Sequence, residues 1–268
     1  MGFFYISFLA IIQGITEFLP VSSSGHLLLI SELLNQPDQT LQVDVAVHFG
    51  TLLAVVMFYR NDFKSLLRGL HKNMVFNFID NEAQFFRLLV LATLPVICAG
   101  FIFKFTGFIY EMRSLKVIGF GMIVFGLILY IADRYGKKNR DNKDWTHKDA
   151  LIMGVWQAFA LVPGTSRSGS TISGAMFLGF SRESSVNLSL IMSIPTIFAS
   201  SMLLLIDFIT IDFENSNVPI IALCVLLSFL SAIIALSILV KFVQNNSFVP
   251  FVVYRLMLGS LILYLAYN

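Results

Sequence analysis

Two polar residues near the start of the chain, Gln13 and Glu17, are spaced so that they could act together. Residues four apart in a helix share one face, so an amide and a carboxylate would point at the same place. Such a pair could bind a hard cation or transfer a proton. The alternative is a satisfied polar patch between helices. A carboxylate in an apolar segment costs roughly 2.5–3.5 kcal/mol to insert into a bilayer, which favours a functional role.

A serine-rich segment with a histidine follows this pair. Ser22, Ser23 and Ser24 precede Gly25 and His26. His26 lies three residues after Ser23, so on a helix an imidazole and a hydroxyl could meet as base and nucleophile. The simpler interpretation is that one serine caps a helix that begins here.

A second polar segment, residues 163–171, places Arg167 among small hydroxyl residues. Free backbone N–H groups at a helix start, the helix dipole and a guanidinium together form an anion site that phosphate matches best. The alternative is that Arg167 only pairs with Glu17. If the two polar segments meet, Glu17, Ser23, His26 and Arg167 make a set of groups suited to phosphoryl transfer. The neighbours expected to bind the substrate are Gln13, Ser22, Ser24, Gly25, Gly164, Thr165, Ser166, Ser168, Gly169 and Thr171.

The composition places both segments in a membrane protein. Of the 268 residues, 57% are hydrophobic and 13% are charged, and the mean hydropathy is +0.80, which excludes an ordinary soluble domain. The expected surroundings are a lipid bilayer, and no basic stripe indicates a nucleic acid partner. Six apolar stretches are long enough to cross a bilayer as helices: 41–59, 85–103, 115–132, 186–206, 218–240 and 248–267.

Two further apolar regions, 2–35 and 150–180, are interrupted by the two polar segments. Each piece is too short to cross, so each region predicts a re-entrant helical hairpin whose irregular tip is buried in protein or lines a wet cavity. The interruptions share the order glutamine, proline, Ser-x-Ser-Gly, which indicates an internal repeat. We therefore expect one membrane domain, 1–268, with repeat one at about 1–132, a loop at about 133–148 and repeat two at about 149–268.

The predicted fold is an all-α polytopic membrane protein with an inverted-topology repeat, because three spans after the first hairpin turn the second half upside down. Its two hairpins should meet near the midplane. The segments 60–72 and 133–148 are rich in Lys and Arg and are predicted to be cytoplasmic loops, whereas 207–217 has acidic residues without Lys or Arg and should lie outside. This topology brings the first hairpin in from the outer face.

The segments QGITEFLPVSSSGH from residue 13 and PGTSRSGSTISG from residue 163 resemble the two signature motifs of bacterial undecaprenyl-diphosphatases of the bacitracin-resistance type. The resemblance runs over essentially the whole chain. It implies a multi-pass enzyme of the bacterial inner membrane that hydrolyses undecaprenyl diphosphate to the monophosphate and inorganic phosphate. This reaction recycles the lipid carrier of cell-wall synthesis. The resemblance also implies a divalent cation, Mg²⁺ or Ca²⁺.

By this resemblance Glu17 matches the essential motif glutamate, Ser23 and His26 match the serine and histidine, and Arg167 matches the arginine of the second motif. Members often carry Glu where this chain has Gln13, so a metal site here depends more on Glu17 and on the phosphates of the substrate. The residues do not decide whether Ser23, His26 or water attacks phosphorus, nor whether the chain forms a homodimer.

The residues were also compared with three other classes of membrane protein. An inverted-repeat transporter or flippase for a polyprenyl phosphate or another anion would need Arg167 but no nucleophile. A structural lipid-binding protein would leave the buried ionisable residues unexplained. Membrane phosphatases of the type-2 phosphatidic-acid class need a second histidine six residues after the arginine, and Ser173 occupies that position. That class is therefore disfavoured.

The other polar residues in apolar stretches are interpreted as structural or supporting. Asp44 and His48 are four apart and could form a private pair, and Arg255 could pair with Asp44 or contact a lipid head group. Aromatic residues near span ends are expected to be interfacial anchors: Tyr135, Trp145 and Tyr254.

Overall fold

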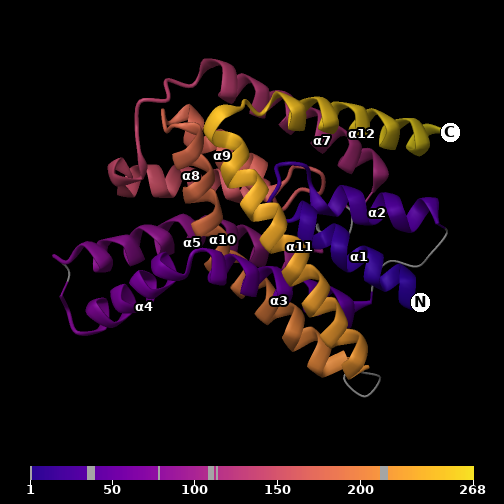
Figure 1. Ribbon diagram of the computed structural model, residues 1–268, viewed down its shortest axis with the longest axis horizontal. Coiled ribbons are helices and arrows are strands. Elements are labelled where there is room, and N and C mark those ends of the chain that lie inside the picture. Colours follow the sequence, from indigo (N-terminus) through magenta and orange to yellow (C-terminus); the bar gives the residue numbers. More distant parts are fainter. Residues whose placement is uncertain (1, 35–39, 78, 108–111, 113, 212–216) are drawn as a thin grey trace.

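The computed structural model describes residues 2–34, 40–77, 79–107, 112, 114–211 and 217–268, and its regular structure in these residues is helical. Figure 1 shows the arrangement, with both termini at one end of the long axis and α4 at the other. In chain order the helices are α1 (Phe3–Thr16), α2 (Ser23–Leu33), α3 (Leu41–Phe58), α4 (Arg60–Met74), α5 (Asn81–Thr106), α7 (Leu115–Tyr135), α8 (His147–Phe159), α9 (Arg167–Phe177), α10 (Arg182–Ile211), α11 (Val218–Asn245) and α12 (Val249–Tyr267).

Six of these helices are long and apolar enough to cross a membrane: α3, α5, α7, α10, α11 and α12. They coincide with the six predicted spans, so the chain is a multi-pass membrane protein with an all-helical fold. The pieces of the two interrupted regions are short helices, α1 with α2 and α8 with α9, of 11 to 14 residues each. The length of these four helices agrees with the predicted hairpins, and their re-entrant position in a bilayer stays a prediction.

The helices of the two halves pack on each other reciprocally. The first helix of each half contacts the second spanning helix of the other half: α1 lies on α11, and α8 lies on α5. The third elements, α3 and α10, contact each other, and so do the last, α7 and α12. In the last pair Gly119 lies near Leu263 whereas Gly126 lies near Arg255, so α7 and α12 are antiparallel. These contacts support the predicted inverted repeat, which itself stays a prediction.

Small residues let α11 approach the first half closely. A Cβ on Gly14 of α1 would clash with the Ser231 hydroxyl and the Ser228 carbonyl, and a Cβ on Gly50 of α3 would clash with the Ser228 hydroxyl. Close packing of this kind is what joins helices in lipid, where no hydrophobic difference drives them together. The helix that carries Glu17 at its end is thereby fixed against the second half.

The segment 60–72 forms the amphipathic helix α4, where the loop prediction was wrong. Its basic residues pair with the start of α5: Arg68 lies 2.6 Å from Glu82, and Lys72 lies 2.8 Å from Asp80. The hydrogen bond from Lys72 holds the pKa of Asp80 below its ordinary value. A run of basic residues at a membrane surface therefore acquires order from neighbouring acids.

The aromatic residues near span ends differ in role. Tyr135 is 75% exposed, as an interfacial anchor requires, whereas Trp145 is 5% exposed and packs in a core cluster with Phe180 and Met153. The anchor prediction was therefore wrong for Trp145, because the connection before α8 folds back onto the helices. The hydroxyl of Tyr254 contacts His26, which is described below.

Candidate active site

The two helix breaks adopt the same local geometry. Ser22 and Ser166 both have left-handed backbones, with φ of 72° and 67°, and each immediately precedes a helix. In each break the hydroxyl of this serine lies 3.2 Å from the hydroxyl two residues later, on Ser24 and Ser168 respectively. Non-glycine residues rarely adopt this conformation, and they cluster at functional sites when they do. The repeat seen in the sequence is therefore also a repeat of backbone shape.

The two breaks contact each other directly. The Gly164 N–H donates to the Ser24 hydroxyl at 3.3 Å, and the Ser168 hydroxyl donates to the Leu19 carbonyl at 3.0 Å. Gly164 has a φ of +90°, and a Cβ at this position would clash with the backbone of Ile118. Only glycine can occupy this turn, since both the conformation and the space exclude a side chain.

An ion pair joins the two halves at this contact. The Arg167 Nη2 lies 2.8 Å from the Glu17 Oε1, and the side chains are 13% and 9% exposed. The Gln13 amide donates to the second carboxylate oxygen at 2.7 Å, so the predicted pairing of Gln13 and Glu17 on one face is correct. Charge-assisted bonds of this geometry are strong in a site with little water. The structural alternative for Arg167, pairing with Glu17, is realised in the free protein.

Two buried polar atoms at the ion pair have no hydrogen-bond partner among the described residues: the Arg167 Nη1 and the Gln13 Oε1. Buried polar groups are nearly always bonded, so each unpaired one requires a reason. One is a donor for an anion, and the other is an acceptor that could bind a cation or a hydroxyl. The ion pair therefore leaves unused capacity for a charged ligand on both of its sides.

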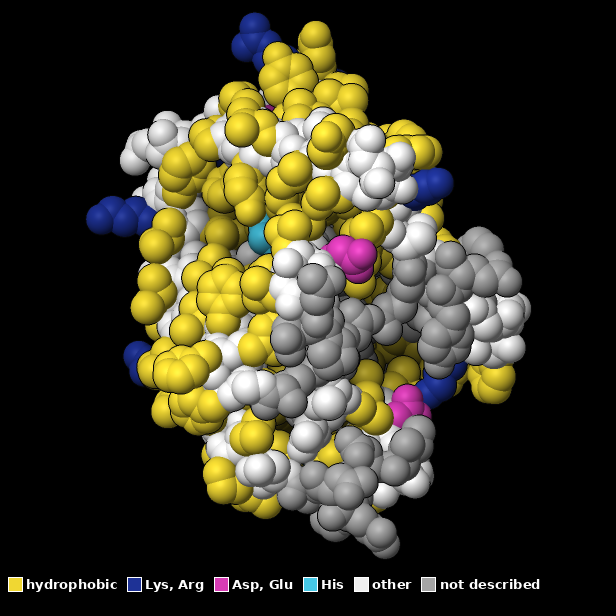
Figure 2. Space-filling view, turned by 90° about the vertical axis from the view of Figure 1, so that its right-hand side faces the viewer, with side chains coloured by type: hydrophobic (Ala, Val, Ile, Leu, Met, Phe, Trp, Pro, Cys, Tyr) yellow, Lys and Arg dark blue, Asp and Glu magenta, His cyan; other side chains and the backbone are white. Residues whose placement is uncertain are grey.

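A cavity of about 200 Å³ lies beside this group. Its lining combines polar side chains, among them those of Gln13, Ser23 and Ser24, with leucines of α1, α2 and α10. Figure 2 views the molecule from the end that carries the termini, where a histidine and an acidic side chain show between hydrophobic ones. The complete lining is Leu9, Gln13, Ser23, Ser24, Leu27, Leu28, Ser31, Asp44, His48, Ile118, Pro163 and Leu204. A ligand with a polar head and an apolar tail matches a cavity that is lined by both polar and apolar side chains.

The sequence match fits this geometry. Residues 6–261 match the family described as bacitracin resistance protein BacA. The chain belongs to the BacA family. Relatives named undecaprenyl-diphosphatase include those of Roseobacter denitrificans (46% identical), Ruegeria pomeroyi (45%) and Jannaschia sp. strain CCS1 (44%), and each match covers all of both chains.

His26 of this BacA-family chain does not bond to Ser23, although the spacing allowed that pair. Its Nδ1 donates to the Ser22 carbonyl at 2.7 Å, and its Nε2 accepts from the Tyr254 hydroxyl at 2.5 Å. The imidazole also stacks on the Tyr254 ring, with centroids 5.5 Å apart. Both ring nitrogens are thus occupied, because the helix turn brings the imidazole back to a backbone carbonyl. The catalytic role of His26 stays a prediction.

Several of the predicted substrate-binding hydroxyls bond to the protein. Thr165, which is 1% exposed, donates to the Val162 carbonyl at 2.8 Å, and Thr171, which is fully buried, lies 2.6 Å from the Ser189 hydroxyl of α10. The Ser166 hydroxyl accepts from the Gly169 N–H at 3.2 Å and so caps α9. These residues hold the second break in shape. Ser23 and Ser24, by contrast, face the cavity.

Arg255 has a larger role than its place in an apolar span indicated. It is fully buried, and within the described part of the chain its guanidinium is held by carbonyl oxygens rather than by a carboxylate. Arginine offers five donors in a rigid fork, which here reach both breaks and α7 at once. The acceptors, 2.9–3.4 Å away, are the carbonyls of Pro20, Gly121, Met122, Gly164 and Thr165. The prediction of pairing with Asp44 or a lipid head group was therefore wrong.

His48 also contributes to the site. Its Nδ1 donates to the Asp44 backbone carbonyl at 2.8 Å, so the four-residue spacing produces a backbone bond. The other nitrogen, Nε2, must then accept, and the Gln13 amide lies 3.4 Å from it. Gln13 is thus oriented by His48 on one side and Glu17 on the other, which leaves its carbonyl oxygen as the unpaired atom.

Proposed function

We propose that this protein is an integral phosphatase of the bacterial inner membrane that hydrolyses undecaprenyl diphosphate to undecaprenyl phosphate and inorganic phosphate. The observation that carries the proposal is the Glu17–Arg167 ion pair, which joins two helix breaks beside a cavity lined by both polar and apolar side chains. The three relatives named undecaprenyl-diphosphatase, at 44–46% identity over the full length, support the same substrate.

Arg167 binds the diphosphate in this proposal. A phosphate that accepts from the unpaired Nη1 competes with Glu17 for the guanidinium, because both ligands are anions. The N–H groups at the starts of α2 and α9 add further donors and two positive dipole ends. Substrate binding then weakens the ion pair and frees the Glu17 carboxylate to act as a base.

Hydrolysis breaks the bond between the terminal phosphorus and the bridging oxygen, and undecaprenyl phosphate leaves. Ser23 is the favoured nucleophile, because it lines the cavity whereas both nitrogens of His26 are bonded elsewhere. In that route the Ser23 hydroxyl forms a phosphoserine, its proton passes to Glu17, and water later releases inorganic phosphate. Arg167 stabilises the charge that develops on the phosphoryl oxygens.

The residues present also fit a divalent cation. Within the described residues no three His, Cys, Asp or Glu side chains gather as metal ligands. The Glu17 carboxylate and the unpaired Gln13 Oε1 offer two oxygens, which suits Mg²⁺, since this ion keeps several waters and takes ligands from phosphates. When bound, the cation would neutralise charge on the diphosphate.

We further propose that the substrate enters from the outer face. The cavity is lined by Asp44 and His48 near the start of α3, Ile118 near the start of α7 and Leu204 near the end of α10. These ends lie opposite α4 and the connection that follows α7, whose basic residues predict the cytoplasmic side. The apolar wall of leucines would receive the first part of the prenyl chain.

The test is release of inorganic phosphate from undecaprenyl diphosphate by purified protein in detergent, with and without Mg²⁺. We expect metal-dependent release that Ser23→Ala abolishes, whereas Ser237→Ala, on α11 away from the cavity, should leave it unchanged. Binding of the lipid without release by the wild type would overturn the proposal and favour a carrier.

A further inference from the structure

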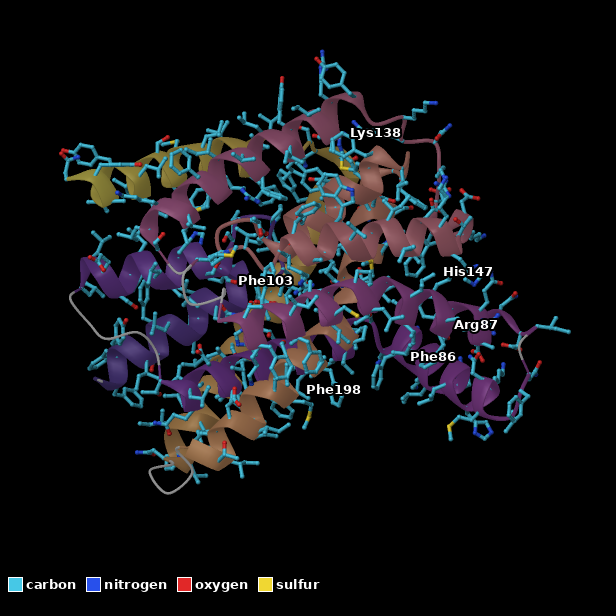
Figure 3. All side chains as sticks on the ribbon, turned by 180° about the vertical axis from the view of Figure 1, so that it is seen from behind. Phe86, Arg87, Phe103, Lys138, His147 and Phe198 are labelled. Atoms are coloured by element: carbon cyan, nitrogen blue, oxygen red, sulfur yellow. The ribbon has the colours of Figure 1, made fainter. Side chains whose placement is uncertain are left out.

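A second cavity lies at the other end of the membrane spans. It has a volume of about 240 Å³ and is bounded by the end of α7, the start of α10 and the turn between α11 and α12. Figure 3 shows Lys138 there, in the connection that follows α7. Its lining residues are Tyr130, Asp133, Arg134, Lys138, Arg182, Ser247 and Val249. Three basic side chains thus face a single carboxylate.

The carboxylate of Asp133 is fully occupied by the protein. It accepts from the Arg182 Nε at 2.6 Å and from the Phe248 backbone N–H at 2.9 Å, and the Lys138 ammonium lies 3.2 Å away. Lys138 also donates to the Asp133 backbone carbonyl. Asp133, which is 4% exposed, therefore orients two cations toward the cavity rather than repelling an anion from it. The charged lining keeps a net charge of +2.

Lys138 has an unusual backbone conformation for a residue with a side chain. Its φ is 54°, in the left-handed region that favours glycine. The contacts of the ammonium with Asp133 offset the strain of this conformation. Glycine would fit the backbone better but would remove a cation from the cavity.

Apolar side chains are exposed on the protein surface beside this cavity. On α7 the exposed side chains Val124, Leu127 and Ile131 recur at helical spacing and lead to the cavity, and on α12 Val249 and Val253 do the same. α7 and α12 lie side by side. A charged cavity at the end of such a surface matches an amphiphile, whose phosphate would enter the cavity while its acyl chains lie along the two helices.

We propose that this cavity binds the phosphodiester head group of an anionic phospholipid, separately from the candidate active site. The ligand chemistry is one phosphate with apolar chains attached. Arg134 and the outer nitrogens of Arg182 contact the phosphate oxygens, Lys138 adds a third cation, and Tyr130 and Ser247 supply hydroxyl donors.

The test measures lipid binding directly, by native mass spectrometry of the detergent-purified protein titrated with phosphatidylglycerol or phosphatidylcholine. We expect the wild type to retain phosphatidylglycerol in preference. Arg134→Gln should weaken this binding about fivefold, as expected for one basic group near an anionic lipid surface. Lys138→Gly should weaken it similarly without loss of thermal stability, because glycine suits the backbone there.

Lys148→Gln is the matched control, since it removes one exposed positive charge from the neighbouring α8 outside the cavity. Equal binding by the wild type, Arg134→Gln and Lys138→Gly would overturn the proposal, and so would an equal loss in Lys148→Gln. Competition by millimolar inorganic phosphate as strong as that by the lipid would assign the cavity to free phosphate instead. None of these outcomes depends on phosphatase activity, so they are independent of the proposed function.

Discussion

The two helix breaks share a backbone but differ in what surrounds them. In α9, nine of the eleven residues are buried, whereas in α2 only four of eleven are, and the second break reaches the cavity through Pro163 rather than through its hydroxyls. The hydroxyls of the second break bond to the protein: that of Thr165 to the Val162 carbonyl within the break, and that of Thr171 to the Ser189 hydroxyl of α10. In the first break, Ser23 and Ser24 face the cavity.

In the proposed site the two breaks therefore have different roles. The first break would contribute the Glu17 carboxylate and the hydroxyls that line the cavity, and the second would contribute the Arg167 guanidinium from a more buried position. A guanidinium that binds an anion is most effective when its position is fixed before binding, because movement of the donor weakens the preorganised electrostatic interaction. Arg255 serves both, since it binds carbonyls of Pro20 and Gly164 in the two breaks.

The largest expected effect comes from removing the cation of the second break. Arg167→Ala should reduce phosphate release about 10³-fold or more, as for other arginines that stabilise phosphoryl transfer. We expect the variant to remain folded, because the Gln13 amide still donates to the Glu17 carboxylate. Release within tenfold of wild type would show that the second break is only structural.

The carboxylate of the first break can be tested in combination with that change. Glu17→Gln should also reduce phosphate release by orders of magnitude. The double variant with Arg167→Ala should release phosphate scarcely more slowly than the less active of the two single variants, because the two residues act as a unit. Turnover of all three proteins under saturating substrate measures this coupling. Additive losses would mean that the two breaks act independently.

Loss of the Arg255 hydrogen bonds that connect the two breaks should reduce the stability of the protein. Arg255→Met removes the guanidinium donors from five carbonyls, three of which, those of Pro20, Gly164 and Thr165, lie in the breaks. We expect a loss of about 3 kcal/mol or more in the free energy of unfolding, since an unsatisfied buried acceptor costs about 1–3 kcal/mol. Arg255→Lys keeps the charge but not the fork, so it should fall between. Thermal unfolding in detergent measures both. An unchanged unfolding temperature for Arg255→Met would contradict this role.

A smaller effect distinguishes the two left-handed serines. Ser22→Gly removes backbone strain and no helix-capping bond, so we expect a gain of about 0.5 kcal/mol. Ser166→Gly relieves the same strain but removes the cap that the Ser166 hydroxyl provides to Gly169, so its stability should be about unchanged. Equal shifts in the two unfolding temperatures would show that the cap contributes nothing.

The smallest effect lies outside both breaks and serves as a reference. Because Lys72 lowers the pKa of Asp80 in the folded protein, the stabilisation from this pair is complete above the ordinary aspartate pKa of about 4 and is lost as the pH falls through the lower folded value. Proteolysis of the α4–α5 connection should therefore increase below about pH 4. Asp80→Asn keeps the cap of α5 and should remove the dependence on acid.

Much of the fold could be predicted because the bilayer constrains it. Hydropathy alone located all six spans, since a membrane helix must be long and apolar throughout. The helix α4 escaped prediction because its alternating basic and apolar residues are equally typical of a surface loop. Its order depends on Asp80 and Glu82 at the start of the next helix, which a charge count of the segment does not include.

Some contacts of the candidate site could be predicted from the sequence and others could not. The pairing of Gln13 with Glu17 follows from helical periodicity and was predictable. The partners of His26 were not, because one ring nitrogen bonds to a backbone carbonyl and only packing of α12 brings the Tyr254 hydroxyl to 2.5 Å from the other. Arg255 was visible as a buried charge, yet its partners are backbone carbonyls, which every residue carries and no sequence pattern marks.

The amino-acid sequence by itself determined the membrane class, the spans, the two interrupted apolar regions and the chemical types at their breaks, because periodicity, hydropathy and local backbone preference act over short stretches of chain. The tertiary structure decided that Glu17 meets Arg167, 150 residues away, that the hydroxyls of Ser23 and Ser24 line a cavity, and that Arg255 bonds to both breaks. These outcomes depend on helix packing across the two halves, where the fit of small residues and the competition among buried donors and acceptors select one arrangement.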